Sequence, residues 1–343
     1  MQDIARRAGV TKAAVSFALN GHAGVSEPTR RRVLAIAHEL GWQPSSAARA
    51  LSDGRAGSFG LVIDRPAATL GIEPFFMRLL SGIQNELSRD NTPLLLAMAE
   101  DQEAELVLYR DWWARRLVDG VFLVDLQVDD VRVRVLQELG LPTVVIGAPL
   151  GTGPFPAVWS DDSAAMATAA AHLAELGHRR IARVSGPSHL RHTAIRDVAF
   201  RQIMGELGIE AVIVESDYTE EHGASATLRV MSAPSRPTAL IYDNDVMALS
   251  GLAAVQSLGL DVPADVSIIA WDDSALCELV RPPLTALSRD IAAYAVHAAR
   301  LLRQAAGGEK VGDLQDIAFS LNLRASTGPS PRWPRQAPHP YRS

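Results

Sequence analysis

The feature that most limits the possible folds of this chain is a regular alternation of short apolar runs and longer helical segments after residue 60. The apolar runs lie at 61–63, 94–97, 121–124, 143–146, 181–184, 211–214, 239–242 and 266–270. Helix-patterned segments separate them, at 77–88, 131–139, 163–176, 195–207 and 247–258. Strands that alternate with helices form parallel sheets with helices on both faces. The rhythm breaks at 149–156, which predicts two doubly wound lobes.

The first twenty residues have a different pattern, that of two short helices joined by a glycine. Gly9 supplies a left-handed turn position, and Thr11 is a suitable N-cap for the second helix. In that helix Val15 and Ala18 face inward. The opposite face carries a small mixed set, namely Lys12, Ala13, Ser16, Phe17 and Asn20. These residues fit either an ordinary helical hairpin or a helix-turn-helix whose second helix enters the DNA major groove.

Charge also separates the start of the chain from the remainder. Residues 1–56 contain eight Lys and Arg against four Asp and Glu, a net charge of +4 within a total of −6. The rest of the chain therefore carries −10. A basic segment on an acidic body concentrates at one end the charge that attracts phosphate groups. This distribution favours a nucleic-acid-binding head.

Composition indicates the cellular compartment and the general class of the protein. A chain of 343 residues with 48% hydrophobic and 21% charged residues is typical of a globular protein of more than one domain. The single cysteine, Cys277, excludes an internal disulfide and suits a reducing compartment. The polar start and the lack of a long apolar run predict neither a signal peptide nor a membrane span. We therefore expect a cytoplasmic protein.

Several short motifs in residues 1–55 resemble the DNA-binding domain of the lactose-repressor (LacI/GalR) family. They are Asp-Ile-Ala, Ala-Gly-Val-Thr, Ala-Val-Ser and Ala-Leu-Asn, then Leu40-Gly41-Trp42 and Ala48-Arg49-Ala50-Leu51. The similarity continues more loosely to about Arg324. The resemblance implies an all-α helix-turn-helix head with a hinge helix, followed by a two-lobed α/β domain of the periplasmic-binding-protein-like type.

The expected domain boundaries follow from this resemblance and from the strand rhythm. The head covers 1–43, the hinge helix and linker 44–57, and the effector-binding and dimerisation domain 58–326. Lobe 1 takes about 58–157 and 289–316, and lobe 2 about 158–288 and 317–326. The segment 281–287 resembles a crossover that returns the chain to lobe 1. Residues 327–343 contain five prolines without periodicity, which predicts a disordered tail. That tail has no leucine heptad for a tetramer, so a homodimer is expected.

The resemblance also assigns the DNA contacts. The predicted set is Thr11, Lys12, Ala13, Ser16, Phe17 and Asn20 in the head, with Ala48 and Leu51 in the hinge. Lys12, Ala13 and Phe17 are placed toward base edges, whereas Ser16 and Asn20 are placed toward phosphates. Leu51 matches the hinge leucine that wedges into a minor-groove step and kinks the duplex. The alternative for this segment is a flexible linker.

Polar side chains at strand ends predict where a ligand binds, because doubly wound sheets bind ligands beyond the carboxyl ends of their strands. Asp64 and Asp125 hold such positions. Asp161, Asp162 and Asp243 follow strands too, but capping of the next helix is at least as good an interpretation for them.

The family resemblance adds further pocket residues. Arg196 matches the effector-binding arginine, Asn244 and Asp272 the groups that bind hydroxyls, and Phe76 and Tyr218 the apolar and aromatic walls. Arg289 lies where the family places another pocket side chain. The full predicted effector site is therefore Asp64, Phe76, Asp125, Arg196, Tyr218, Asn244, Asp272 and Arg289. Carboxylate, amide and guanidinium groups beside an aromatic face suit a sugar.

The implied function is a homodimeric transcriptional repressor of sugar-uptake or sugar-utilisation genes. It binds a palindromic DNA operator and is released by a small sugar-like effector. One alternative is a regulator that requires a nucleobase or another metabolite as co-repressor. A solute-binding protein is a further alternative, but it would carry a signal peptide and no basic head.

An enzyme is not expected. The sequence has no G-x-S-x-G elbow, no P-loop and no His-x-x-x-His pair on a helix. His172, His178 and His192 are expected to be surface or packing residues. No cofactor, metal or membrane partner is indicated.

Overall fold

The computed structural model describes residues 1–19, 21–42, 55–65 and 73–331. Its contacts divide the chain into two units, Met1–Gly57 and Ser58–Ser343. The predicted hinge helix falls almost wholly on 43–54, outside the described residues, and Ala48 and Leu51 fall there with it. Asn20 and the end of the predicted tail, 332–343, also lie outside them.

The first unit contains three short helices around a small apolar core. They are α1 (Gln2–Ala8), α2 (Lys12–Leu19) and α3 (Glu27–Glu39). Ile4, Val15 and Val33, one from each helix, are almost fully buried in that core. Gly9 ends α1 with a φ of 63°, the left-handed conformation expected at this turn. The Thr11 hydroxyl caps α2 by accepting from the Ala14 N–H at 3.1 Å.

Lobe 1 of the second unit contains a six-stranded sheet in the order β11-β5-β4-β3-β1-β2, and every pair is parallel. The strands are β1 (Phe59–Asp64), β2 (Leu94–Ala99), β3 (Val121–Leu123), β4 (Thr143–Ile146), β5 (Ala157–Trp159) and β11 (Leu314–Gln315). The helices are α6 (Pro74–Leu87), the short η1 (Ser88–Asp90), α7 (Gln102–Ala114), α8 (Val131–Leu139) and α14 (Ile291–Ala306).

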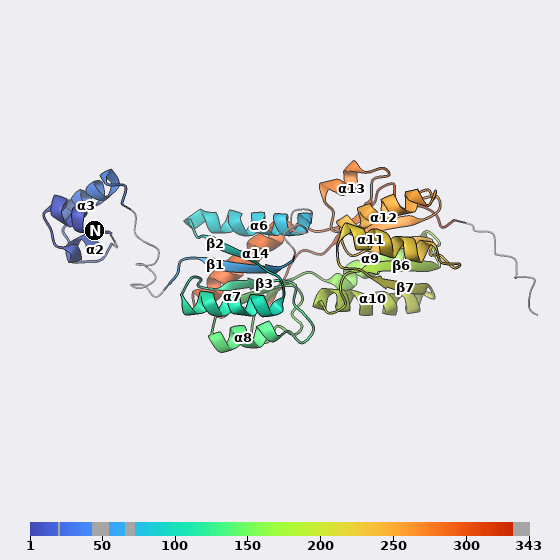
Figure 1. Ribbon diagram of the computed structural model, residues 1–343, viewed down its shortest axis with the longest axis horizontal. Coiled ribbons are helices and arrows are strands. Elements are labelled where there is room, and N and C mark those ends of the chain that lie inside the picture. Colours follow the sequence, from blue (N-terminus) through green and yellow to red (C-terminus); the bar gives the residue numbers. More distant parts are fainter. Residues whose placement is uncertain (20, 43–54, 66–72, 332–343) are drawn as a thin grey trace, which may run out of the picture. The chain divides into compact units, whose positions relative to one another are not determined.

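Helices cover both faces of this sheet (Figure 1). Along β1, Leu61 and Ile63 pack into the core shared with α6 and α14, whereas Val62 faces the core shared with α7 and α8. Successive side chains of β1 therefore point alternately into the two cores, one on each face of the sheet. This explains why the sequence of β1 is a continuous apolar run.

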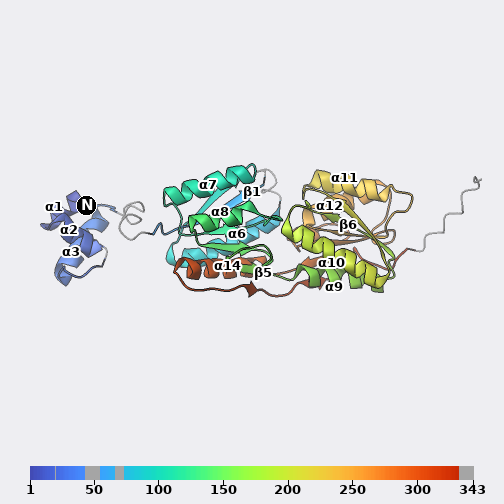
Figure 2. The same cartoon turned by 90° about the horizontal axis from the view of Figure 1, so that it is seen from below.

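Lobe 2 repeats the arrangement with the order β12-β10-β9-β8-β6-β7, parallel except that β12 runs antiparallel to β10 (Figure 2). The strands are β6 (Arg180–Ser185), β7 (Glu210–Glu215), β8 (Ala239–Tyr242), β9 (Ser267–Trp271), β10 (Thr285–Ser288) and β12 (Ser320–Asn322). The helices are α9 (Asp162–Glu175), α10 (Arg191–Leu207), α11 (Glu220–Met231), α12 (Asp245–Ser257) and α13 (Ala275–Leu279). The predicted fold class of a helical head and two doubly wound lobes is thus confirmed for the described residues.

One approximate lobe boundary and the predicted crossover differ from the structure. The boundary predicted at about 157 falls inside β5, which pairs with β4 through Val158 and so belongs to lobe 1. The segment 281–287, predicted as a crossover, contains most of β10, which pairs with β9 in lobe 2. The chain leaves lobe 2 after Ser288, where β10 ends, which agrees with the lobe boundary predicted at 288. Both strands are short and follow proline-containing segments, so they do not stand out as separate apolar runs.

The start of the predicted disordered tail is also wrong, because residues 327–331 pack against lobe 2. The Thr327 hydroxyl lies 3.1 Å from His172 Nε2, and the Gly328 carbonyl lies 3.1 Å from His178 Nε2. The Ser330 N–H donates to the Leu176 carbonyl at 2.8 Å. Backbone hydrogen bonding of this kind gives no hydrophobic periodicity.

Among the described helices, none is both long and apolar enough to cross a bilayer.

Candidate binding pocket and nucleic-acid interface

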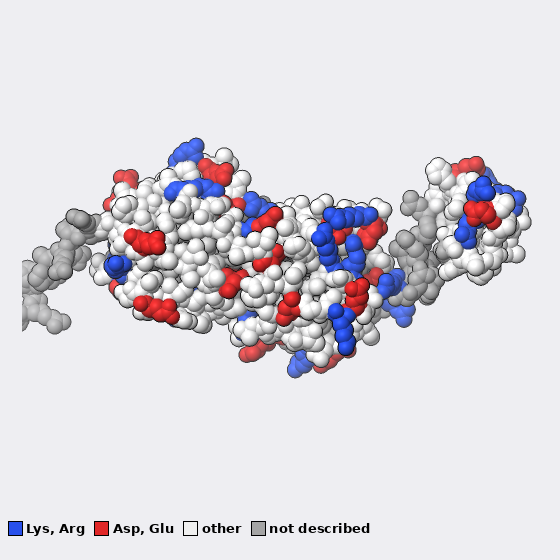
Figure 3. Space-filling model, turned by 180° about the vertical axis from the view of Figure 1, so that it is seen from behind, with Lys and Arg blue, Asp and Glu red and all other residues white. Residues whose placement is uncertain are grey.

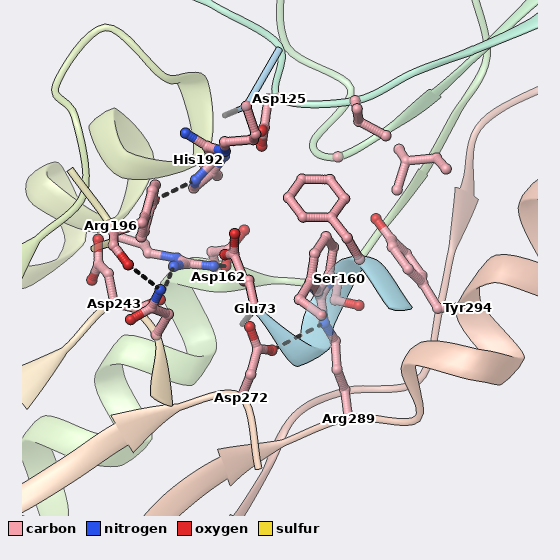
Figure 4. A pocket seen from close by; sticks show the side chains of 18 residues that line it. Glu73, Asp125, Ser160, Asp162, His192, Arg196, Asp243, Asp272, Arg289 and Tyr294 are labelled. Carbon is pink, nitrogen blue, oxygen red and sulfur yellow. Dashed lines mark hydrogen bonds and ion pairs between the residues drawn. The ribbon is translucent and has the colours of Figure 1, made fainter. Parts of the chain in front are cut away.

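A polar pocket in the second unit is lined by residues of both lobes (Figure 4). The space between its walls, including the part open to solvent, is about 680 Å³. The predicted residues that line it are Phe76, Asp125, Arg196, Tyr218, Asn244, Asp272 and Arg289. Their contact with a ligand stays a prediction.

Asp64 is the predicted residue that does not line the pocket. Successive side chains of a strand point to opposite faces, and the next residue, Arg65, lines the pocket instead. Arg65 pairs with Asp125 at 2.9 Å. Burial works against the charge of Asp125, but Arg65 and His192 outweigh it, and the pKa of Asp125 lies below its ordinary value.

The predicted effector site omits eleven of the eighteen lining residues. The additional residues are Arg65, Glu73, Phe75, Val124, Ile146, Gly147, Ser160, Asp162, His192, Asp243 and Tyr294. Asp162 and Asp243 carried a signal, since both follow strands, a position that fits either a helix cap or a ligand contact. His192 precedes Arg196 by one helical turn on α10, and Phe75 adjoins Phe76. His192, expected to be a surface or packing residue, packs against Tyr218 and also lines the pocket.

Arg196 is the most constrained side chain of the pocket. It is 5% exposed, donates through Nε to Asp162 at 2.9 Å, and its Nη1 donates to the Asp243 carbonyl at 3.3 Å. Its guanidinium carbon lies 3.8 Å from the centroid of the Trp271 ring. Burial alone disfavours its charge, but Asp162 and Asp243 raise the pKa of Arg196 above its ordinary value. The guanidinium is thus held in place before any ligand binds.

Carboxylates after strands turn out to have three different roles. Asp161 caps α9 by accepting from the Ala164 N–H at 2.9 Å, as the capping interpretation expected. Asp162 instead pairs with Arg196. Asp243 is not a cap: it accepts from Arg183 Nε at 2.7 Å and from the Gly186 N–H.

The N-cap of α12 is Asn244, a predicted ligand-binding residue. Its Oδ1 accepts from the Met247 N–H at 2.8 Å, and its Nδ2 donates to the Tyr218 carbonyl at 3.1 Å. A side-chain amide offers two N–H groups and two acceptor lone pairs. One donor and one acceptor position therefore remain for a ligand after capping.

Tyr218 forms an aromatic wall whose hydroxyl is held by α10. His192 Nε2 lies 2.6 Å from the Tyr218 hydroxyl, and Thr193 Oγ1 lies 3.1 Å from it. Burial, with a contribution from Arg196, lowers the pKa of His192 to about 4. The imidazole is therefore neutral near pH 7, and its tautomer decides which of the two groups donates the hydrogen bond.

This wall depends on a glycine, which yields a prediction. A β-carbon at Gly186 would overlap the Tyr218 ring, so Gly186→Ala should displace the ring and lower the free energy of unfolding by about 1–3 kcal/mol. The matched control is Gly205→Ala on α10, where a β-carbon meets nothing within 4 Å; that change should be neutral or stabilising by up to about 1 kcal/mol. Urea denaturation of both variants measures the difference. Equal effects would contradict the close packing.

Arg289 lies among aromatic rings at the point where the chain passes between the lobes. Its guanidinium carbon lies 4.7 Å from the Tyr294 centroid, 4.9 Å from that of Phe319 and 5.6 Å from that of Phe75. Its Nε lies 3.9 Å from Asp272 Oδ1. Cation–π contacts fix the orientation of such a group without using its N–H donors.

The first unit presents part of the predicted DNA-reading face. Lys12 and Ala13 are exposed, and the Phe17 ring is 44% exposed although it packs edge-on against His22 at 6.0 Å. Ser16 is half-buried. An exposed aromatic ring beside a lysine on one helix suits contact with base edges in the major groove.

On the face of the body that Figure 3 shows, basic and acidic side chains of the described residues are interspersed, and the basic ones gather most densely on one part of it. Arg300 and Arg303, for example, both pair with Glu86.

Comparison with known proteins assigns the family. A family model described as bacterial regulatory proteins, lacI family, matches residues 1–45, and a periplasmic binding protein-like domain matches residues 170–327. The HTH-type transcriptional regulator AglR of Rhizobium meliloti is 34% identical, over 99% of this chain and 98% of that protein.

Two solved structures are similar over most of their length. A LacI family regulator from Bifidobacterium animalis subsp. lactis is 39% identical with a TM-score of 0.75, covering 80% of this chain and 99% of that one. A complex of the regulator CelR with cellobiose is 29% identical with a TM-score of 0.73, covering 94% and 98%. The chain therefore belongs to the LacI family, whose members are DNA-binding transcriptional regulators and not enzymes.

Proposed function

We propose that this regulator is a cytoplasmic homodimer that represses genes of sugar uptake or utilisation. The exposed face of α2 reads one half of a palindromic operator, and a sugar-like effector in the pocket weakens that binding. Two copies are needed because a palindromic site presents two half-sites related by a twofold axis. The further DNA contacts proposed for Asn20, Ala48 and Leu51 belong to the same hypothesis.

The observation that carries this proposal is the pocket itself. It combines fixed polar groups, such as Arg196 and Asp272, with the aromatic walls of Phe76 and Tyr218. Sugars present hydroxyls at their edges and C–H groups on their ring faces, so they match such a lining. The complex of the related regulator CelR with cellobiose supports the same ligand class.

Two measurements test the function. Thermal shift with a panel of sugars and nucleobases should identify a sugar that raises the melting temperature. Titration of the full chain on DNA from upstream of its own gene should then give weaker binding with that sugar, by about 1–3 kcal/mol of coupling. Stronger operator binding with the ligand present would favour the co-repressor alternative.

Lys12 yields a prediction on specificity. If Lys12 bonds a guanine edge, Lys12→Ala should weaken binding to the operator by roughly 1–3 kcal/mol and leave binding to unrelated DNA nearly unchanged. The matched control is Lys310→Ala, at an exposed position after α14, which should change neither affinity. Fluorescence anisotropy on operator and scrambled duplexes measures both. An equal loss of affinity on both duplexes would indicate that Lys12 contacts only phosphates.

A further inference from the structure

The pocket lining has more acidic than basic residues, and each of its arginines lies within ion-pair distance of a carboxylate of the lining. Three arginines and five acidic residues line it. Each arginine has a carboxylate partner within the lining: Arg65 has Asp125 at 2.9 Å, Arg196 has Asp162 at 2.8 Å, and Arg289 has Asp272 at 3.9 Å. An anionic ligand would have to displace one of these partners or meet the surplus of acid.

Glu73 is the acidic residue of this lining that pairs with no arginine. It precedes Pro74 at the start of α6 and does not cap that helix with its side chain. The residue is 7% exposed, and its Oε2 has no hydrogen-bond partner among the described residues. Figure 4 draws it between the Arg196 group and Arg289. A buried carboxylate oxygen without a partner is costly unless a donor reaches it.

Four more buried polar atoms of the lining lack a hydrogen-bond partner in the described structure. They are Arg65 Nε, Ser160 Oγ, Asp272 Oδ1 and Arg289 Nε, and their residues line the same pocket as Glu73. Carboxylate oxygens only accept hydrogen bonds when ionised, guanidinium N–H groups only donate, and a serine hydroxyl does both. The free positions therefore include both acceptors and donors, and hydroxyl groups on one ligand can serve both because each hydroxyl donates and accepts.

We infer that Glu73 is a specificity-determining residue, which accepts a hydrogen bond from a hydroxyl of an uncharged polyhydroxylated ligand while the acid-rich lining rejects its phosphorylated form. This inference rests on the proposed function and adds to it the charge class of the effector and the residue that selects it.

The surroundings of Glu73 make its contribution to ligand affinity depend on pH. Burial raises the pKa of Glu73 to about 7, against the opposing effect of Arg65; Asp125, Asp272 and Asp245 raise it further. A ligand hydroxyl donates more strongly to the ionised carboxylate than to the neutral acid. Ligand affinity should therefore rise with pH between 6 and 8, by about fivefold.

The first experiment compares neutral and charged ligands on the full chain. Calorimetry is run with glucose, maltose, cellobiose and trehalose, with the 6-phosphate of each, and with glucosamine. The neutral sugar that binds best should lose at least about 100-fold in affinity on phosphorylation. Binding of a phosphate as tight as that of its neutral partner, or tighter binding of glucosamine, would overturn the inference.

The second experiment changes Glu73 itself. At pH 8, Glu73→Gln should weaken binding of the same sugar about fivefold and remove its pH dependence, and Glu73→Ala should weaken it at least about tenfold. The control Glu103→Gln removes an exposed carboxylate on α7 and should leave both affinity and pH profile as in wild type. Thermal melts establish that each variant is folded.

The outcomes separate this inference from the proposed function. If a neutral sugar binds and weakens operator binding but Glu73→Gln leaves affinity and pH profile unchanged, only the role of Glu73 fails. If no sugar binds the folded wild-type chain, the sugar-controlled function fails and the inference fails with it.

Discussion

Arg132→Met is expected to lower the free energy of unfolding by about 3–5 kcal/mol, because it leaves buried carboxylates without their cation. The Arg132 side chain on α8 is 2% exposed, and it bonds Glu105 at 2.7 Å, Asp130 at 2.6 Å and the Asp125 carbonyl at 2.8 Å. Glu105 is fully buried on α7. The pair therefore joins two helices in the core of lobe 1, and methionine fills the volume without supplying the charge.

The loss should depend on pH in a defined direction. Burial raises the pKa of Glu105 above its ordinary value even with Arg132 present, so the variant should raise it further. A carboxyl whose folded pKa lies above its unfolded value destabilises the fold at high pH, and the cost is relieved as pH falls through the folded pKa. Denaturation of the variant should show the largest loss near pH 8 and a smaller one near pH 5.5.

A matched control lies on the same helix. Arg134 is exposed and lies 3.9 Å from Glu138, so Arg134→Met should change stability by no more than about 0.5 kcal/mol. Similar losses for the two variants would contradict the importance of the buried cluster. A loss for Arg132→Met that grows toward acid pH would contradict the assigned role of Glu105.

The shortest edge strands escape prediction from the sequence, for a physical reason. A central strand such as β8, buried on both faces, reads as an unbroken apolar run. The edge strands β11 and β12 are only two and three residues long and carry exposed side chains. Their backbone pairing is set by the neighbouring strand, which leaves no local hydrophobic pattern to detect.

The sequence predicts a pocket residue where that residue directly follows a strand, because this position places it at the carboxyl edge of the sheet. Asp125 and Asp272 follow strands, and both line the pocket. Tyr294 could not be found this way, because its place depends on how α14 packs. Asp162 also follows a strand, but its position does not distinguish a helix cap from a pocket residue. The Asp162–Arg196 pair joins residues 34 positions apart, and no local pattern encodes such a contact.

Arg196→Ala is expected to abolish the response of the regulator to its effector, with ligand affinity reduced at least about 100-fold. A guanidinium has five N–H donors. Contacts to Asp162 and Asp243 engage only some of them, so the remainder can bind ligand hydroxyls from a fixed position. The DNA-reading face belongs to the separate first unit, and operator affinity without ligand should therefore stay as in wild type.

This substitution also carries a stability cost that must be separated from the functional one. It leaves Asp162, which is 8% exposed, without its cation, and the expected loss is about 3 kcal/mol. The double variant Arg196→Ala with Asp162→Asn removes the uncompensated charge. It should regain part of the stability but none of the ligand response, because the donors are still missing.

Operator titration with and without the effector decides between the alternatives. The control Arg201→Ala removes an exposed arginine from the same helix, 65% exposed and 3.9 Å from Asp197, and should respond to ligand like wild type. If the double variant recovers both stability and response, Arg196 acts through folding and not as a ligand-binding group. If Arg196→Ala itself responds like wild type, the effector site lies elsewhere, because a buried guanidinium at the centre of the lining cannot be lost from a binding site without changing affinity.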